Sequence, residues 1–127
     1  MRLHHVGFAC LDLAETCASF QAMGLGRPEA PPLMDHGRGV LLQLLGTADG
    51  TLLALVQGPS VEAMAKKGHA LYHTCWEVAS LEEASQTLLD GGARALGEPA
   101  PAPLFNGRRV AFFSTAAGIV ELLEAAP

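Results

Sequence analysis

The chain contains an internal repeat, and a repeat restricts the possible folds more strongly than any single motif does. The segment from His5 to Asp12 aligns with the segment from His73 to Ser80 at a shift of 68 residues. The segment from Leu52 to Gln57 aligns with the segment from Ile119 to Glu124 at a shift of 67 residues. Each copy begins with a histidine on an apolar strand and ends with a second apolar strand. The sequence therefore predicts two structural modules of the same type.

A helix is expected after the first strand of each copy. Apolar residues recur at helical spacing over 13–23 and over 81–89. Asp12 and Ser80 directly precede these segments as N-caps, and glycines follow both of them. Each helix is therefore expected to run for about three turns.

Three short strands separated by turn residues are expected after each helix. The expected strands are 30–35, 39–45 and 51–57 in the first copy, and 93–97, 108–114 and 118–124 in the second. The repeated order is βαβββ, so the fold class is α+β with two tandem modules. We expect a single domain over 1–127, with module 1 at about 1–57, a linker at 58–70 that holds a short helix, and module 2 at about 71–127.

Composition excludes several classes of function. Eight Lys and Arg residues against thirteen Asp and Glu residues, with no basic run, argue against a nucleic-acid partner. The three cysteines form no CxxC pair, which excludes a zinc finger and indicates reduced thiols in a cytoplasmic protein. The N-terminus does not have the layout of a signal peptide, and glycine and polar residues interrupt the apolar region at 40–56, so no membrane span is expected.

The two adjacent histidines near the N-terminus cannot have the same role. Neighbouring side chains on a strand point to opposite faces, so His5 shares a face with Gly7 and Ala9, whereas His4 shares the bulky apolar face with Phe8. The bulky face must be covered by the helix. His5 is therefore the residue expected to face a ligand, and His4 is expected only to border the core.

The second copy places two more polar side chains in the same way. His73 opens its first strand, and Glu121 lies on the last strand between the apolar residues Val120 and Leu122, pointing to the opposite face. Two imidazoles and one carboxylate can bind a divalent ion as a facial triad with open positions for substrate. The sequence therefore predicts a metal site made of His5, His73 and Glu121.

The segments LHHVGFAC, YHTCWEV and GIVELLE resemble the vicinal oxygen chelate superfamily, which includes glyoxalase I, methylmalonyl-CoA epimerase and the extradiol dioxygenases. The resemblance to methylmalonyl-CoA epimerase is closest, because the stretch NGRRVAF from Asn106 to Phe112 also matches that family. It implies that the modules form a cupped, half-open eight-stranded barrel with a divalent metal ion inside. It also implies a homodimer, with His5, His73 and Glu121 as metal ligands.

Two positions depart from the epimerase pattern. The family has a fourth ligand, Gln or Glu, where this chain has Ala54 or, with a different gap, Leu55. Epimerisation needs an acid and a base on opposite sides of the reacting carbon. Glu121 is the catalytic candidate on one side, but Leu42 stands where the opposing carboxylate is expected, next to Gln43.

Three functions follow from these residues. The first is a metal-dependent isomerase or lyase that stabilises the enolate of a small carboxylate, thioester or 2-oxo substrate, using Zn, Co, Ni, Mn or Fe(II). Asn106, Arg108 and Arg109 follow a proline-rich loop and are candidates for holding an anionic group of this substrate. The second is a non-haem Fe(II) dioxygenase, and the third is a metal-free module for small-molecule binding or resistance.

Overall fold

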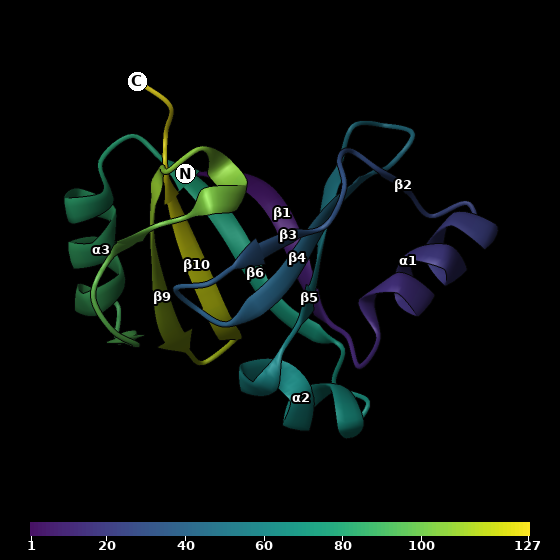
Figure 1. Ribbon diagram of the computed structural model, residues 1–127. Coiled ribbons are helices and arrows are strands. Elements are labelled where there is room, and N and C mark those ends of the chain that lie inside the picture. Colours follow the sequence, from purple (N-terminus) through teal and green to yellow (C-terminus); the bar gives the residue numbers. More distant parts are fainter. The chain divides into compact units, whose positions relative to one another are not determined.

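Three α-helices and ten strands make up the computed structural model, which describes all 127 residues (Figure 1). The helices are α1 (Leu13–Ala22), α2 (Pro59–Lys66) and α3 (Leu81–Asp90), with a short 3-10 helix η1 (Pro103–Phe105). The strands are β1 (Arg2–Ala9), β2 (Arg27–Pro28), β3 (Leu33–Asp35), β4 (Val40–Gly46), β5 (Leu52–Gln57), β6 (Leu71–Val78), β7 (Arg94–Ala95), β8 (Ala100–Pro101), β9 (Arg109–Thr115) and β10 (Gly118–Glu124). The predicted α+β class is confirmed. The chain divides into two compact units, one of residues 5–72 and one of residues 1–4 with 73–127, which are described separately.

The helices begin and end as the sequence predicts. The side chains of Asp12 and Ser80 accept hydrogen bonds from the backbone N–H three residues later, at 3.0 and 3.2 Å. Gly24, Gly68 and Gly92 follow the C-caps of α1, α2 and α3 with φ of 74°, 78° and 99°. Glycine adopts this left-handed conformation without a Cβ clash, so each helix stops there.

Residues 5–72 form a sheet with α1 on one face. The strand order is β2-β4-β5-β1, with β3 paired to β4, and β1 runs parallel to β5. Leu13 and Cys17 of α1 pack with Leu45 and Leu55, and Phe8 of β1 lies against the same cluster. The face that carries Phe8 is therefore the covered one, as the alternation predicts.

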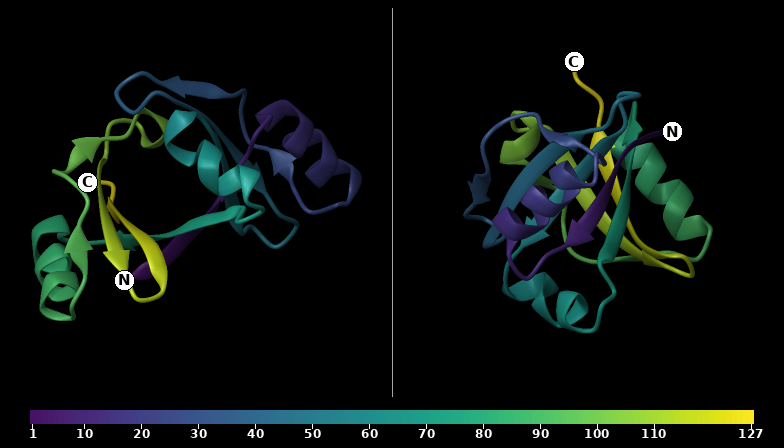
Figure 2. Two further views of the ribbon diagram at one scale, coloured as in Figure 1. Left: turned by 90° about the horizontal axis from the view of Figure 1, so that it is seen from below. Right: turned by 90° about the vertical axis from the view of Figure 1, so that its right-hand side faces the viewer.

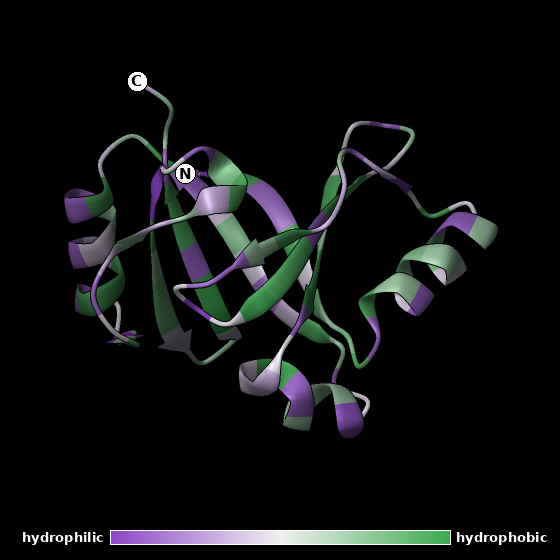
Figure 3. Ribbon diagram, in the orientation of Figure 1, coloured by the Kyte–Doolittle hydropathy of each residue, from purple (hydrophilic) through white to green (hydrophobic).

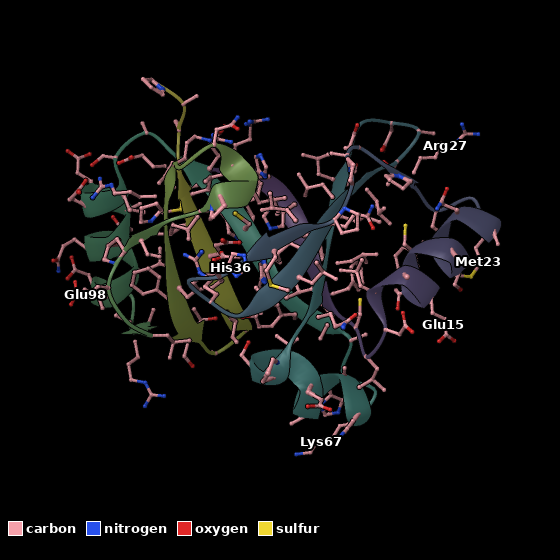
Figure 4. All side chains as sticks on the ribbon, viewed as in Figure 1. Glu15, Met23, Arg27, His36, Lys67 and Glu98 are labelled. Carbon is pink, nitrogen blue, oxygen red and sulfur yellow. The ribbon has the colours of Figure 1, made fainter.

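The opposite face of β5 is packed by α2. Val61 of this helix forms a cluster with Ala9, Val40 and Val56. The expected short helix between the two copies is thus present, and it covers one end of the face on which His5 was predicted to lie. Figure 4 shows Glu15 of α1 and Lys67 at the end of α2 pointing away from the strands.

The other unit repeats this arrangement with α3. Its strand order is β6-β10-β9-β7, with β8 paired to β9. Leu81 and Ala84 of α3 pack on Phe113 and Leu122, with Trp76 against the same cluster, and Figures 1 and 2 show α3 alongside β9 and β10. The hydrophobic side of α3 faces these strands and its hydrophilic side faces outward (Figure 3). Trp76 is therefore a core residue beneath the helix.

Two strand predictions differ from the structure. The strand expected at 30–35 is reduced to Leu33–Asp35, because Pro31 and Pro32 have no backbone N–H to donate to a neighbouring strand. The strand expected at 93–97 contains only Arg94–Ala95. None of the three helices combines the length and the apolar character that crossing a membrane would require.

Gly58 joins β5 to α2 where two segments of main chain approach each other closely. A Cβ at this position would lie 2.7 Å from the carbonyl oxygen of Gly39 and 2.9 Å from Cγ1 of Val40. The first of these atoms belongs to the backbone, so it cannot move aside as the end of a side chain can.

We expect Gly58→Ala to lower the free energy of unfolding by about 1–3 kcal/mol, because the added methyl group overpacks this junction. Urea denaturation of the two proteins measures the difference. Gly37→Ala is the matched control, since a Cβ there would meet only Asp35 Oδ1 at 3.4 Å. Equal destabilisation by both substitutions would show that the close approach at Gly58 is not the cause.

Candidate metal centre

His73 on β6 and Glu121 on β10 lie together in the unit of residues 1–4 and 73–127. Nε2 of His73 is 2.9 Å from Oε1 of Glu121, and the two residues are only 6% and 5% exposed. Their neighbours Val120 and Leu122 pack beneath α3, so Glu121 points to the opposite face. Figure 3 shows a hydrophilic stretch in the middle of β10, which is otherwise hydrophobic. Within this unit, the structure thus places His73 and Glu121, which are both predicted metal ligands, in contact with each other.

Cys75 and Phe112 complete the surroundings of this pair. Cys75 lies opposite Glu121 in the parallel pairing of β6 and β10, and it is fully buried. Burial raises the pKa of the Cys75 thiol strongly, and the negative charge of Glu121 and a hydrogen bond to its carboxylate raise it further. The ring of Phe112 packs edge-on against His73, with 5.8 Å between the ring centroids. The carboxylate of Glu121 therefore faces one imidazole and one thiol in a site largely closed to water.

His5 belongs to the unit of residues 5–72 and is 2% exposed. It lies opposite Leu52 of β5, on the strand face that also carries Gly7 and Ala9. The preceding residue, His4, belongs to the other unit. Its ring packs edge-on against Phe105 of that same unit, with 5.2 Å between the ring centroids. The two histidines thus have different surroundings, as the strand alternation predicts.

The two positions that depart from the epimerase pattern, Ala54 and Leu42, both carry apolar side chains and both lie in this unit. Ala54 and Leu42 lie on the same sheet face as His5, because their positions are cross-strand partners of that row of residues. Gln43 lies on the other face, where its Nε2 donates a hydrogen bond to the carbonyl oxygen of Ala30 at 3.1 Å. Across β1, β4 and β5, His5 is the only titratable residue on its face.

The predicted substrate-binding residues have three different environments. Arg108 donates from Nη1 to Glu77 Oε2 at 2.8 Å, whereas Arg109 donates to Glu82 at 2.8 Å and is ion-paired with Glu124. Asn106 is exposed and ends η1 with φ of 57°. The structure therefore does not bring these three side chains to one place.

Arg2 and Glu77 were not identified from the sequence. Arg2 donates to the same Glu77 carboxylate as Arg108, with Nε at 3.2 Å from Oε1. Arg2 and Arg108 stand more than a hundred positions apart, so no local pattern joins them. The only available signal was the alternation of β6, which places Glu77 on the face of His73.

A model of the glyoxalase/bleomycin resistance protein/dioxygenase superfamily matches residues 4–112. The chain belongs to this superfamily. It is 32% identical to the ethylmalonyl-CoA/methylmalonyl-CoA epimerase of Cereibacter sphaeroides, over 87% of this chain and 86% of the relative. The predicted superfamily and the closeness to epimerases are therefore confirmed.

Solved structures of epimerases have the same fold. A variant of Streptomyces coelicolor methylmalonyl-CoA epimerase in complex with 2-nitronate-propionyl-CoA is 26% identical, with a TM-score of 0.81 and coverage of 100% of this chain and 99% of that chain. Methylmalonyl-CoA epimerase from Mycobacterium tuberculosis is 19% identical, with a TM-score of 0.80 and coverage of 99% and 89%. The chain is thus an epimerase-like member of the superfamily.

The buried thiol of Cys75 gives a chemical test of this site. Because its pKa is raised, we expect Cys75 to remain unalkylated by iodoacetamide in the folded protein at pH values near the usual thiol pKa of about 8.5. Mass spectrometry of peptides measures the labelling, with urea-unfolded protein as the fully reactive control. Glu121→Gln removes one cause of the shift and should increase labelling. Labelling of Cys75 at the unfolded rate in the native protein would contradict the buried environment.

Proposed function

We propose that this chain is a metal-dependent epimerase of the superfamily, acting on a coenzyme A thioester of a small carboxylic acid. The observation that carries the proposal is the buried contact between His73 and Glu121 on the strand face away from α3. The substrate class follows from the epimerase relatives and from the solved complex with 2-nitronate-propionyl-CoA. The homodimer and the cytoplasmic location stay predictions.

The proposed metal ligands are His5, His73 and Glu121. All three are buried, and each offers one donor atom of a kind that divalent ions bind. Two imidazole nitrogens and one carboxylate oxygen suit Zn, Co, Ni, Mn or Fe(II). A divalent ion bound by these residues would supply Lewis-acid stabilisation of the negative charge that develops on a substrate carbonyl oxygen.

Glu121 is also the proposed base. Its carboxylate, which lies 2.9 Å from Nε2 of His73, is assigned to remove the proton next to the thioester carbonyl. Leu42 and Ala54, on the His5 face of the other unit, can neither donate nor accept a proton. The proposal therefore assigns proton removal to Glu121 and delivery of a proton to the opposite face of the carbon to a water molecule, and Glu121 then returns its proton to water.

A non-haem Fe(II) dioxygenase is the second candidate, and the observation that favours it is Ala54. With an alanine in place of the fourth ligand, the set of two histidines and one glutamate matches the triad of Fe(II) oxygenases, which keep positions open. A metal-free binding module remains the outcome if the protein holds no metal.

The metal site is tested by the metal content of protein purified without a chelating tag. We expect wild-type protein to retain a divalent metal, and His5→Ala, His73→Ala and Glu121→Gln to lose most of it, as measured by elemental analysis. His69→Ala is the control, because His69 is exposed after α2 and should retain wild-type metal content. If the wild-type protein holds no more metal than the three variants, both metalloenzyme functions fail.

The reaction is tested by solvent exchange of the substrate α-proton. We expect methylmalonyl-CoA in deuterated water to gain deuterium at that carbon when protein and metal are both present. NMR spectra recorded over time measure this exchange. Glu121→Gln at saturating metal should slow this exchange by about a hundredfold or more, because the base is lost. Oxygen uptake by the Fe(II)-loaded protein without such exchange would favour the dioxygenase instead.

A further inference from the structure

Arg108 and Arg109 are adjacent in the chain but have opposite charge environments. The carboxylate of Glu77 accepts hydrogen bonds from both Arg108 and Arg2, so two cations surround one anion. The guanidinium of Arg109 instead donates to two carboxylates, those of Glu82 and Glu124. The first cluster carries an excess positive charge, and the second carries an excess negative charge.

The positive cluster also has unused hydrogen-bond donors. A guanidinium has five N–H donors, and only Nη1 of Arg108 is engaged, by Glu77 at 2.8 Å and by the backbone oxygen of Glu124 at 3.4 Å. Its Nε and Nη2 donate to no acceptor in the structure. The Arg108 guanidinium is held over the ring of Phe105, 5.8 Å from the centroid, and its side chain is 20% exposed. These donors are therefore fixed in position and accessible to a ligand.

The cluster lies on the same face of its unit as the metal-ligand candidates. Glu77 is two residues beyond Cys75 on β6, and Cys75 is the direct neighbour of Glu121. Side chains two residues apart on a strand share a face and are separated by about 7 Å. Arg109 lies on the other face, against Glu82 of α3. Of the two adjacent arginines, only Arg108 therefore contacts the strand face that carries His73 and Glu121.

We propose that Arg2 and Arg108, bridged by Glu77, form a subsite for an oxyanion of the substrate. A planar guanidinium binds carboxylate and phosphate oxygens in pairs, so the ligand group is a carboxylate of the acyl part or a phosphate of the coenzyme part. The inference rests on the proposed function for the identity of the substrate. Glu77 stays ionised between the arginines, because their hydrogen bonds lower the pKa of its carboxyl, and so it compensates one of the two positive charges and leaves the other for a ligand anion.

The subsite is tested with malonate and coenzyme A as separate probes, using isothermal titration calorimetry on metal-free protein. We expect at least one probe to bind, with an affinity that falls as salt rises. Binding of malonate alone assigns the site to the acyl carboxylate, and binding of coenzyme A alone assigns it to phosphate. Arg108→Gln should weaken that binding by about tenfold or more.

Three variants control for the loss of one positive charge and for the bridging carboxylate. Arg94→Gln removes an exposed arginine on β7 and should leave binding unchanged. Arg109→Gln should also leave binding unchanged, because that guanidinium is occupied by two carboxylates. Glu77→Gln removes the competing anion and should tighten binding. Thermal melting confirms that each variant is folded.

The proposal is overturned if neither probe binds, if Arg108→Gln weakens binding no more than Arg94→Gln or Arg109→Gln does, or if Glu77→Gln weakens it. The metal content of the wild-type protein separates this proposal from the metal site. Probe binding that Arg108→Gln weakens, in a wild-type protein that holds no metal, would leave the subsite standing while the proposed function fails. If the wild-type protein retains metal but Arg108→Gln does not weaken probe binding, the proposed metal site stands and the proposed subsite fails.

Discussion

The carboxylate of Glu121 is buried in strand β10. The packing of strands β6 and β10 in its unit depends on side chains that pair with or hydrogen-bond to this carboxylate. An ionised group removed from water costs several kcal/mol or more unless hydrogen bonds and opposite charges replace its hydration. His73 approaches to 2.9 Å from the parallel strand β6, and the thiol of Cys75 donates a hydrogen bond to the same carboxylate. A strand residue can be polar in the middle of a core only where the neighbouring strand supplies such partners in register. The requirement explains why these side chains lie on one face.

In both units, one face of the strands is covered by a helix, but the opposite faces carry different numbers of titratable residues. In each, one helix buries the bulky residues of the strands, such as Phe8 beneath α1 and Trp76 beside α3. The other face carries His73 and Glu121 in one unit, whereas His5 is the only titratable residue of the corresponding strands in the other. Ala54 stands where the repeat would place a second carboxylate. Proton chemistry is therefore assigned to one copy of the repeat.

Local patterns in the sequence determined the helices, their caps and the faces of the long strands. Asp12, Ser80 and the glycines after the helices act within a few residues, and alternation along β1 separated His4 from His5. The edge strands were less predictable, because Pro31 and Pro32 limit pairing and strands of two residues carry no periodicity. The partners of Arg108 were not predictable. They depend on Arg2 and Glu77, which reach it only through the fold.

The polar residues of the motif from Asn106 to Phe112 have different charge environments. Asn106, Arg108 and Arg109 of this motif were expected to bind one anionic group, but the adjacent residues Arg108 and Arg109 at the start of a strand point in opposite directions. Arg109 pairs with Glu82 of α3 and Glu124, so its charge is already compensated on the helix side. Arg108 shares one carboxylate with Arg2, and its charge is compensated only in part. Since a ligand anion is attracted by uncompensated charge, the ratio of arginines to carboxylates on each face decides which residue of the motif can contribute to binding.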